Sequence, residues 1–117
     1  MSDTFLTRSA LLAKTSKPLE GTSTKAMSLE VIATQLQELP GWQLNEGFIE
    51  RSFGFTDYHN TIAFMNSIAL MIHTEDHHPE LLVTYNKCKV RFNTHSVNGI
   101  SINDFICAAK TDALYGR

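Results

Sequence analysis

The chain has 117 residues, which is the size of one domain, and a formal net charge of −2 at pH 7. With 43% hydrophobic and 19% charged residues, its composition is that of a globular protein with one modest core. The sequence shows no run of lysine or arginine and no apolar stretch near the roughly 18 residues that a membrane span needs, so we expect neither nucleic acid nor membrane as a partner.

Residues 1–27 are rich in serine, threonine and lysine and are expected to form a flexible N-terminal arm. A short apolar patch within residues 4–13 could dock on the domain as a helical turn. The composition also allows an organelle transit peptide, but the acidic residues and the scarcity of arginine weigh against that alternative. The folded domain is predicted to span residues 28–117.

The domain shows alternating helical and strand patterns, with Ser28 as the first N-cap and Pro40-Gly41 as the first stop. The predicted elements are a helix over 29–39, strands over 42–45 and 48–55, a helix over 58–74, strands over 81–85 and 88–94, and a helix from 101 onward. This order predicts an α+β fold, a four-stranded antiparallel sheet with helices packed on one face.

The helix predicted over 58–74 is apolar over more than one narrow stripe. Such a helix must be covered on two sides, so we expect its own sheet on one side and a partner subunit on the other, which makes the protein a homo-oligomer. Cys88 and Cys107 lie far apart in apolar segments without a CxxC pattern. Buried free thiols in a reducing, cytoplasmic setting are therefore expected.

Histidines gather around the loop between the long helix and the third strand. His77 and His78 are adjacent in this loop, and His95 follows the fourth strand. Strand alternation places His95 on the polar face, where it would face a cleft. Because imidazole exchanges protons near neutral pH, the cluster indicates a metal site or proton transfer, set against the alternative of a solvated loop that happens to carry histidines.

Three chemistries compete for these histidines. Zinc could take three histidines and a water, but His77 and His78 are neighbours whose side chains should point to opposite faces, and no HExxH or paired-cysteine pattern is present. For nucleophilic catalysis, the sequence has neither a GxSxG elbow nor a cysteine in a polar, histidine-flanked context. General acid–base catalysis of a dehydration, which needs a proton donor and a proton acceptor, uses every feature noted.

The histidine loop and the segments after it carry a four-part motif. It consists of Asp76-His77-His78-Pro79-Glu80, Tyr85-Asn86-Lys87, Thr94-His95, and Gly99 with Asp104. With its spacings, and with Gly41-Trp42 ahead of the first hairpin, the region 28–114 resembles the bacterial branch of the pterin-4a-carbinolamine dehydratase family.

The resemblance implies a lyase that uses no metal and no cofactor. Its substrate would be the 4a-hydroxytetrahydropterin left by aromatic amino acid hydroxylases, and its products quinonoid dihydropterin and water. The resemblance also implies sheets joined across a homodimer, with dimers often paired through the long helix into a homotetramer. Members of the family also serve as dimerisation partners of transcription factors, and related domains as assembly factors, so a non-catalytic role is the alternative.

Residue by residue, the resemblance implies that His77, His78 and His95 are the acid–base histidines and that Asp104 supports His95. The expected pterin-binding residues are Trp42, Asp76, His77, His78, Asn93, Thr94, His95 and Ser96. Three of these assignments have a simpler alternative: Asp104 has capping-box spacing from Ser101, Trp42 is of a type more often found in the core, and His78 could only orient the loop. His73 stands where many members carry an acidic residue.

Overall fold

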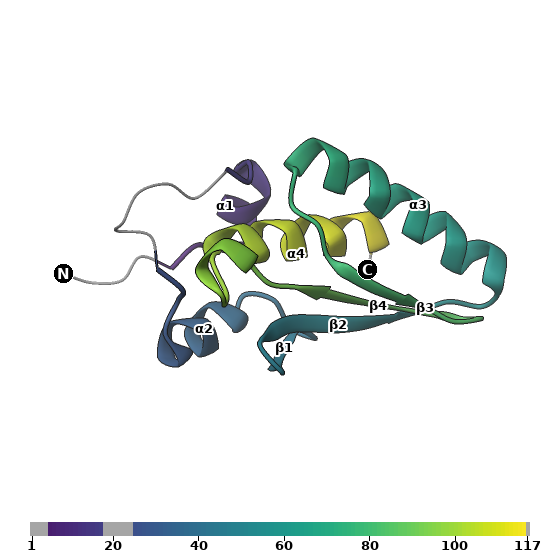
Figure 1. Ribbon diagram of the computed structural model, residues 1–117. Helices are drawn as coiled ribbons and strands as arrows, with labels where there is room; N and C mark the ends of the chain where they lie inside the picture. The colour runs from purple at the N-terminus through teal and green to yellow at the C-terminus, as the bar shows by residue number, and fades with distance from the viewer. Residues whose placement is uncertain (1–4, 18–24, 117) are drawn as a thin grey trace.

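The computed structural model describes residues 5–17 and 25–116, and it confirms the predicted α+β fold (Figure 1). Predictions for residues 1–4 and 18–24, which belong to the expected arm, lie outside the described residues. The elements in chain order are α1 (Arg8–Ala13), α2 (Leu29–Leu36), β1 (Gln43–Asn45), β2 (Phe48–Gly54), α3 (Tyr58–Glu75), β3 (Glu80–Val83), β4 (Lys87–Phe92), the 3₁₀ turn η1 (His95–Val97) and α4 (Ile102–Tyr115).

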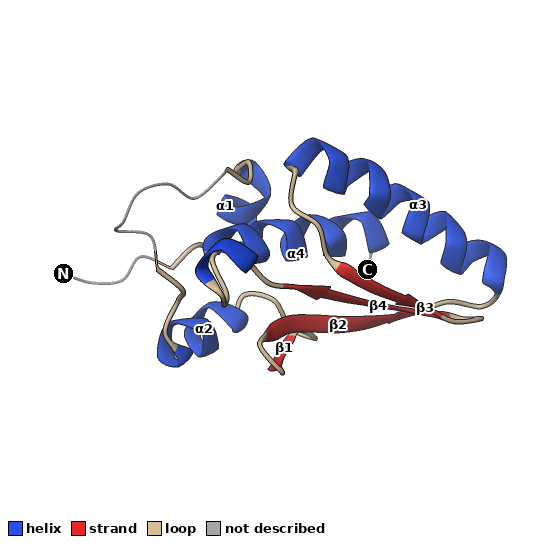
Figure 2. Ribbon diagram, in the orientation of Figure 1, coloured by secondary structure: helices blue, strands red, loops and turns tan. Residues whose placement is uncertain are grey.

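The four strands form one antiparallel sheet in the order β1-β2-β4-β3. The two central strands pair from Ile49 opposite Phe92 to Gly54 opposite Lys87. The first hairpin turns at Glu46 and Gly47, both with positive φ, which is the left-handed geometry that suits the twist of a tight hairpin. Figure 2 shows α3 and α4 lying over the same side of this sheet.

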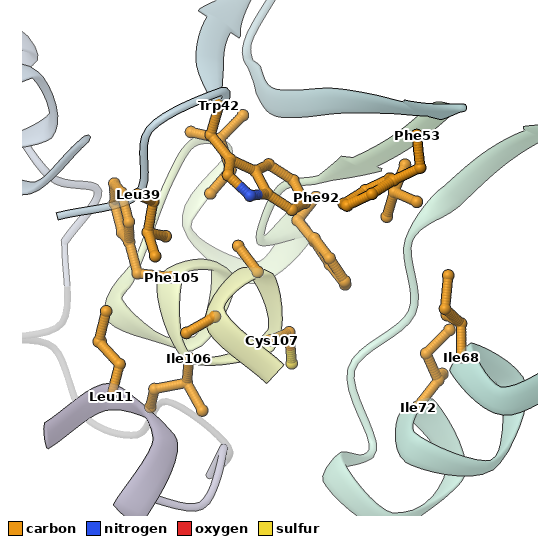
Figure 3. Close-up of a cluster of buried hydrophobic side chains, with 14 of the residues drawn as sticks. Leu11, Leu39, Trp42, Phe53, Ile68, Ile72, Phe92, Phe105, Ile106 and Cys107 are labelled. Atoms are coloured by element: carbon orange, nitrogen blue, oxygen red, sulfur yellow. The ribbon is translucent and has the colours of Figure 1, made fainter. Parts of the chain in front are cut away.

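The core fills the space between the sheet and α3 and α4. Phe53 and Phe92 from the sheet, Ile68 from α3 and Phe105 from α4 are at most 1% exposed. Figure 3 shows Phe53 and Phe92 coming from the sheet, Phe105 from α4 and Ile68 from α3, all members of one apolar cluster. One face of the long helix α3 is used in this way, while Leu70 on another face is 72% exposed.

The N-terminal patch docks as a helical turn, as its apolar residues predicted. Thr7 caps α1, and Leu11 is fully buried next to Ile106 of α4 (Figure 3). A domain boundary at residue 28 stays a prediction, but the core includes this one side chain from the expected arm. No helix in the described ranges is long and apolar enough to cross a membrane.

Candidate active site

The end of α3 directs the histidine loop toward the start of α4. Asp76 closes α3 in the left-handed conformation, with φ of 54°, which turns the chain sharply into His77. Two residues later Pro79 leads into β3. His77 lies half-buried on the core side of this turn, with its ring stacked on that of Phe92 at 6.0 Å between centroids and 12° between planes. The turn and the stacking together fix the ring's orientation.

A buried carboxylate holds His77. The His77 Nε2 atom lies 2.6 Å from Oδ1 of Asp104, whose side chain is fully buried. The other oxygen of Asp104 accepts hydrogen bonds from the Thr94 hydroxyl at 2.7 Å and from the Ser101 backbone N–H at 2.9 Å. The resemblance assigned Asp104 to His95, whereas the structure places its carboxylate against His77.

Asp104 is also the third residue of α4 and completes the predicted capping box with Ser101. The two readings of Asp104, helix cap and histidine partner, are therefore compatible, because each uses a different carboxylate oxygen. The cap fixes the position of the carboxylate, and the carboxylate fixes His77.

A cavity of about 370 Å³ opens beside this pair, a volume within the usual range for small-molecule sites. Its lining residues come from the loop after α3, the segment after β4, the start of α4 and the chain just after α1. They are Ser16, Lys17, Asp76, His77, His78, Asn93, Thr94, His95, Ser96 and Asn103. The structure thus brings together the three histidines and the other predicted pterin-binding residues except Trp42.

Trp42 packs in the core, which was the simpler alternative for it. It is 5% exposed, and its ring lies about 6 Å between centroids from each of Phe53 and Phe92. Its indole N–H donates to Oδ1 of Asp112 at 2.9 Å. Trp42 supports the strands behind the cavity and does not line it.

His95 is exposed to the cavity, but strand alternation is not what places it there. The strand β4 ends at Phe92, and His95 opens the turn η1. A bridge between Thr94 and Gly99 closes the loop around η1, with backbone hydrogen bonds of 2.7 and 3.3 Å. The exposure prediction for His95 was right, and the supporting element is a turn.

Three residues that line the cavity were missed from the sequence. Ser16 and Lys17 belong to the expected arm, and no local pattern distinguishes them from their neighbours. Asn103 lies between Ser101 and Asp104 in the first turn of α4 and is 5% exposed. An asparagine beside a helix cap is the one local signal that points to this position.

The cysteines do not supply a nucleophile. Both are free and buried, as expected. Burial raises the pKa of Cys88 and raises that of Cys107 to about 12, where the charges of Glu75 and Asp104 act in the same direction. Within the described residues, no group of three histidine, cysteine or acidic side chains is arranged to hold a metal ion.

A larger cavity, about 720 Å³, lies at the other ends of α3 and α4. Its walls carry the aromatic rings of Phe55, Phe64 and Tyr115 together with amides and hydroxyls, and its described lining includes no histidine or carboxylate. Size alone would favour this cavity. The chemistry of a proton-transfer site favours the smaller one.

The chain is similar to known proteins of one family. A family model described as "Pterin 4 alpha carbinolamine dehydratase" matches residues 25–114. A protein of Bdellovibrio bacteriovorus named "Putative pterin-4-alpha-carbinolamine dehydratase" is 52% identical over 117 residues, covering 97% of this chain and 94% of the relative. A protein of the same name from Nitrosospira multiformis is 45% identical over 105 residues, covering 90% and 92% of the two chains.

Two solved structures are similar. A "transcriptional coactivator/pterin dehydratase" from Brucella melitensis superposes with a TM-score of 0.75 at 35% identity, covering 79% of this chain and all of the other. A pterin dehydratase-like protein identified as a RuBisCO assembly factor in the alpha-carboxysome gives a TM-score of 0.54 at 21% identity, covering 64% and 87%. The second likeness concerns the fold alone.

Proposed function

The chain belongs to the pterin 4 alpha carbinolamine dehydratase family, and we propose that it dehydrates a 4a-hydroxytetrahydropterin to the quinonoid dihydropterin by histidine general acid–base catalysis. Such a reaction supports pterin recycling for aromatic amino acid hydroxylation, and the biopterin form is the natural candidate substrate. The single observation that carries the proposal is His77 paired with the buried Asp104 on the wall of a cavity that His78 and His95 also line.

The proposed reaction moves two protons and changes no oxidation state. One histidine donates a proton to the 4a-hydroxyl group, the C4a–O bond breaks with its electron pair leaving on oxygen, and water departs. A second histidine, or a water molecule held by it, removes an N–H proton from the pterin ring, which completes the quinonoid system. His77 and His95 are the candidates for the donor, with groups of this kind contributing a factor of about 10² to 10⁴.

Asp104 defines what His77 can do in this scheme. Because Nε2 of His77 is engaged by the carboxylate, Nδ1 is the ring nitrogen left for the substrate. A carboxylate behind an imidazole fixes its orientation and stabilises the imidazolium that forms when it accepts a proton. His78 is more exposed than His77 and also borders a second cavity of about 370 Å³, whose lining includes His73 and several apolar residues, so we assign His78 to substrate contact.

The test is the dehydration rate of a double variant. His77→Ala with His95→Ala should bring the rate down toward that of the spontaneous reaction, measured by stopped-flow absorbance with an enzymatically generated 4a-hydroxytetrahydropterin. His59→Ala is the matched control, because His59 lies exposed at the start of α3 and away from the cavity. Unchanged turnover in the double variant would rule the assignment out.

We also propose that the reaction needs no metal or other cofactor, since proton transfer suffices. Prolonged dialysis against EDTA should leave the dehydration rate unchanged. A loss of rate that added zinc restores would contradict this. The buried thiols of Cys88 and Cys107 support a reducing, cytoplasmic location.

Self-association into a homodimer or homotetramer is the further part of the proposal. It is supported by apolar residues on α3 that the chain leaves uncovered, with Leu70 72% exposed and Ala69 beside it also exposed. Sedimentation velocity at micromolar concentration should show an oligomer, and Leu70→Glu should shift it toward smaller species. A wild-type protein that sediments as a monomer would exclude self-association.

A non-catalytic role as a coactivator or assembly module is the second candidate. The Brucella melitensis protein is described as a "transcriptional coactivator/pterin dehydratase", and this description favours keeping the non-catalytic role as a candidate. Exposed apolar surface on α3 would serve a foreign helix as readily as a second copy. If the protein is an active dehydratase and captures no partner helix, the non-catalytic role is excluded and only the dehydratase proposal remains.

A further inference from the structure

The N-terminal arm contributes to the cavity through a short stretch that we call the strap, residues 15–17. Its backbone is tied down at two places. The Ser16 N–H donates to Oε1 of Glu75 at 2.8 Å. The Lys17 N–H donates to Oδ1 of Asn103 at 3.2 Å, and the Asn103 side-chain amide donates back to the Lys17 carbonyl at 2.6 Å.

Asn103 therefore pairs with the Lys17 backbone as a neighbouring strand would, through one donor and one acceptor. This recognition does not depend on the Lys17 side chain. Asn103 is itself fixed, because it is 5% exposed and its own backbone N–H donates to the Ser101 hydroxyl at 3.2 Å. Without the strap, the side-chain amide of Asn103 would lose both of its hydrogen bonds to the Lys17 backbone.

Glu75 provides the second attachment and is equally fixed. It is 5% exposed, and its other carboxylate oxygen accepts from Nζ of Lys110 at 2.7 Å. The ion pair neutralises the carboxylate, and the Ser16 N–H satisfies its remaining oxygen. The strap is thus held between α3 and α4 by groups that have few alternative partners.

The two attachment residues are neighbours of the two residues that form the proton-transfer pair. Glu75 precedes His77 by two positions, and Asn103 directly precedes Asp104. Ser16 and Lys17 line the same cavity as the histidines. The strap also lies outside residues 25–114, the range that the family model matches.

Resting on the function proposed above, we propose that the strap is a wall of the pterin site and that Asn103 is the positioning residue that seats it. The strap narrows the cavity and contacts the bound substrate, while the proton transfers belong to the histidines. Unseating the strap therefore weakens substrate binding and leaves the chemical step nearly intact. A strap that only covered the core would change the stability of the fold and would leave KM as it was.

Proline substitution removes the backbone donor of Lys17. Lys17→Pro and Lys17→Ala both remove the ammonium group, but only the proline lacks the N–H that donates to Asn103. We expect KM for the 4a-hydroxytetrahydropterin to be about five- to tenfold higher for Lys17→Pro than for Lys17→Ala, which is the equivalent of about one hydrogen bond, with kcat within about twofold. Lys14→Ala, in the same arm and exposed, should behave as wild type.

Asn103→Ala provides the complementary variant. It should raise KM to a similar extent, and combining it with Lys17→Pro should add little, because both changes break the same contact. Binding of 7,8-dihydropterin, followed by fluorescence, should weaken in parallel with KM. Urea unfolding of each variant verifies that the domain is folded.

Two results are decisive and distinct. A wild-type chain that neither dehydrates the substrate nor binds the dihydropterin would overturn the proposed function. An active wild type with KM and dihydropterin affinity unchanged in Asn103→Ala, and equal in Lys17→Pro and Lys17→Ala, would overturn the role of the strap alone.

Discussion

Replacing Asp104 with asparagine separates the two roles of this buried carboxylate, which are to cap α4 and to hydrogen-bond His77. Asparagine has nearly the same shape and keeps one oxygen that can accept from the Ser101 N–H and the Thr94 hydroxyl, as Oδ2 does now. The group that would face Nε2 of His77 becomes an NH₂ donor in place of Oδ1. The helix cap survives this change, and the carboxylate behind the imidazole does not.

The expected magnitudes follow from these contacts. A hydrogen bond to a charged group is worth about 1.5–3 kcal/mol, and each 1.4 kcal/mol is a factor of about ten in rate, so kcat should fall about 10- to 100-fold. The unfolding free energy should fall by only about 1 kcal/mol, because the buried donors of the cap keep an acceptor and the new NH₂ group can donate to Nε2 of a neutral His77. A large loss of rate with a small loss of stability is the signature of a histidine partner.

Stopped-flow dehydration and urea unfolding measure the two effects on the same preparations. Ser101→Ala is the matched variant, because it removes the N-cap side chain at a cost of about 1 kcal/mol and leaves the Asp104–His77 contact in place. Its kcat should stay close to wild type. If Asp104→Asn lost stability but kept the wild-type kcat, Asp104 would be a helix cap only and the reasoning here would be refuted.

Two further predictions concern the fold. Leu11→Ala should lower the unfolding free energy by about 2–5 kcal/mol in urea, because the side chain is fully buried against α4; a loss below about 1 kcal/mol would mean that α1 contributes little to the core. With its pKa raised by burial to about 12, Cys107 should resist iodoacetamide at pH 8 in the folded chain and react once urea unfolds it. Because the pKa of Cys107 is higher in the folded chain than in the unfolded one, its contribution to the unfolding free energy should be fully present below about pH 9 and should decline toward pH 12. Rapid labelling at pH 8, or a urea midpoint that does not fall over this alkaline range, would argue against the burial of this thiol.

Short-range signals were enough for most of the fold. The capping-box spacing of Ser101 and Asp104 located the start of α4, and Asn45-Glu46-Gly47 located the first hairpin turn. Both depend on contacts within a few residues, which a sequence displays directly. The histidine cluster was also recognisable, since the motif fixes its members even though His77 and His95 come from different elements.

Contacts between distant segments were what sequence reasoning could not supply. The pairing of Asp104 with His77 instead of His95 depends on how α4 lies against the end of α3. The strap depends on backbone groups of Ser16 and Lys17, and backbone donors and acceptors are the same at every non-proline residue, so they leave no trace in the sequence. Trp42 illustrates the same limit, because its buried partner Asp112 is 70 residues away.

The position of a bound pterin tests the central claim most directly. In a crystal soaked with a dihydropterin, we expect ring density in the cavity between the His77–His78 loop and His95, with the strap of residues 15–17 in contact with it. A pterin bound instead in the larger aromatic cavity by Phe55 and Tyr115, with the histidine cavity empty, would contradict the account.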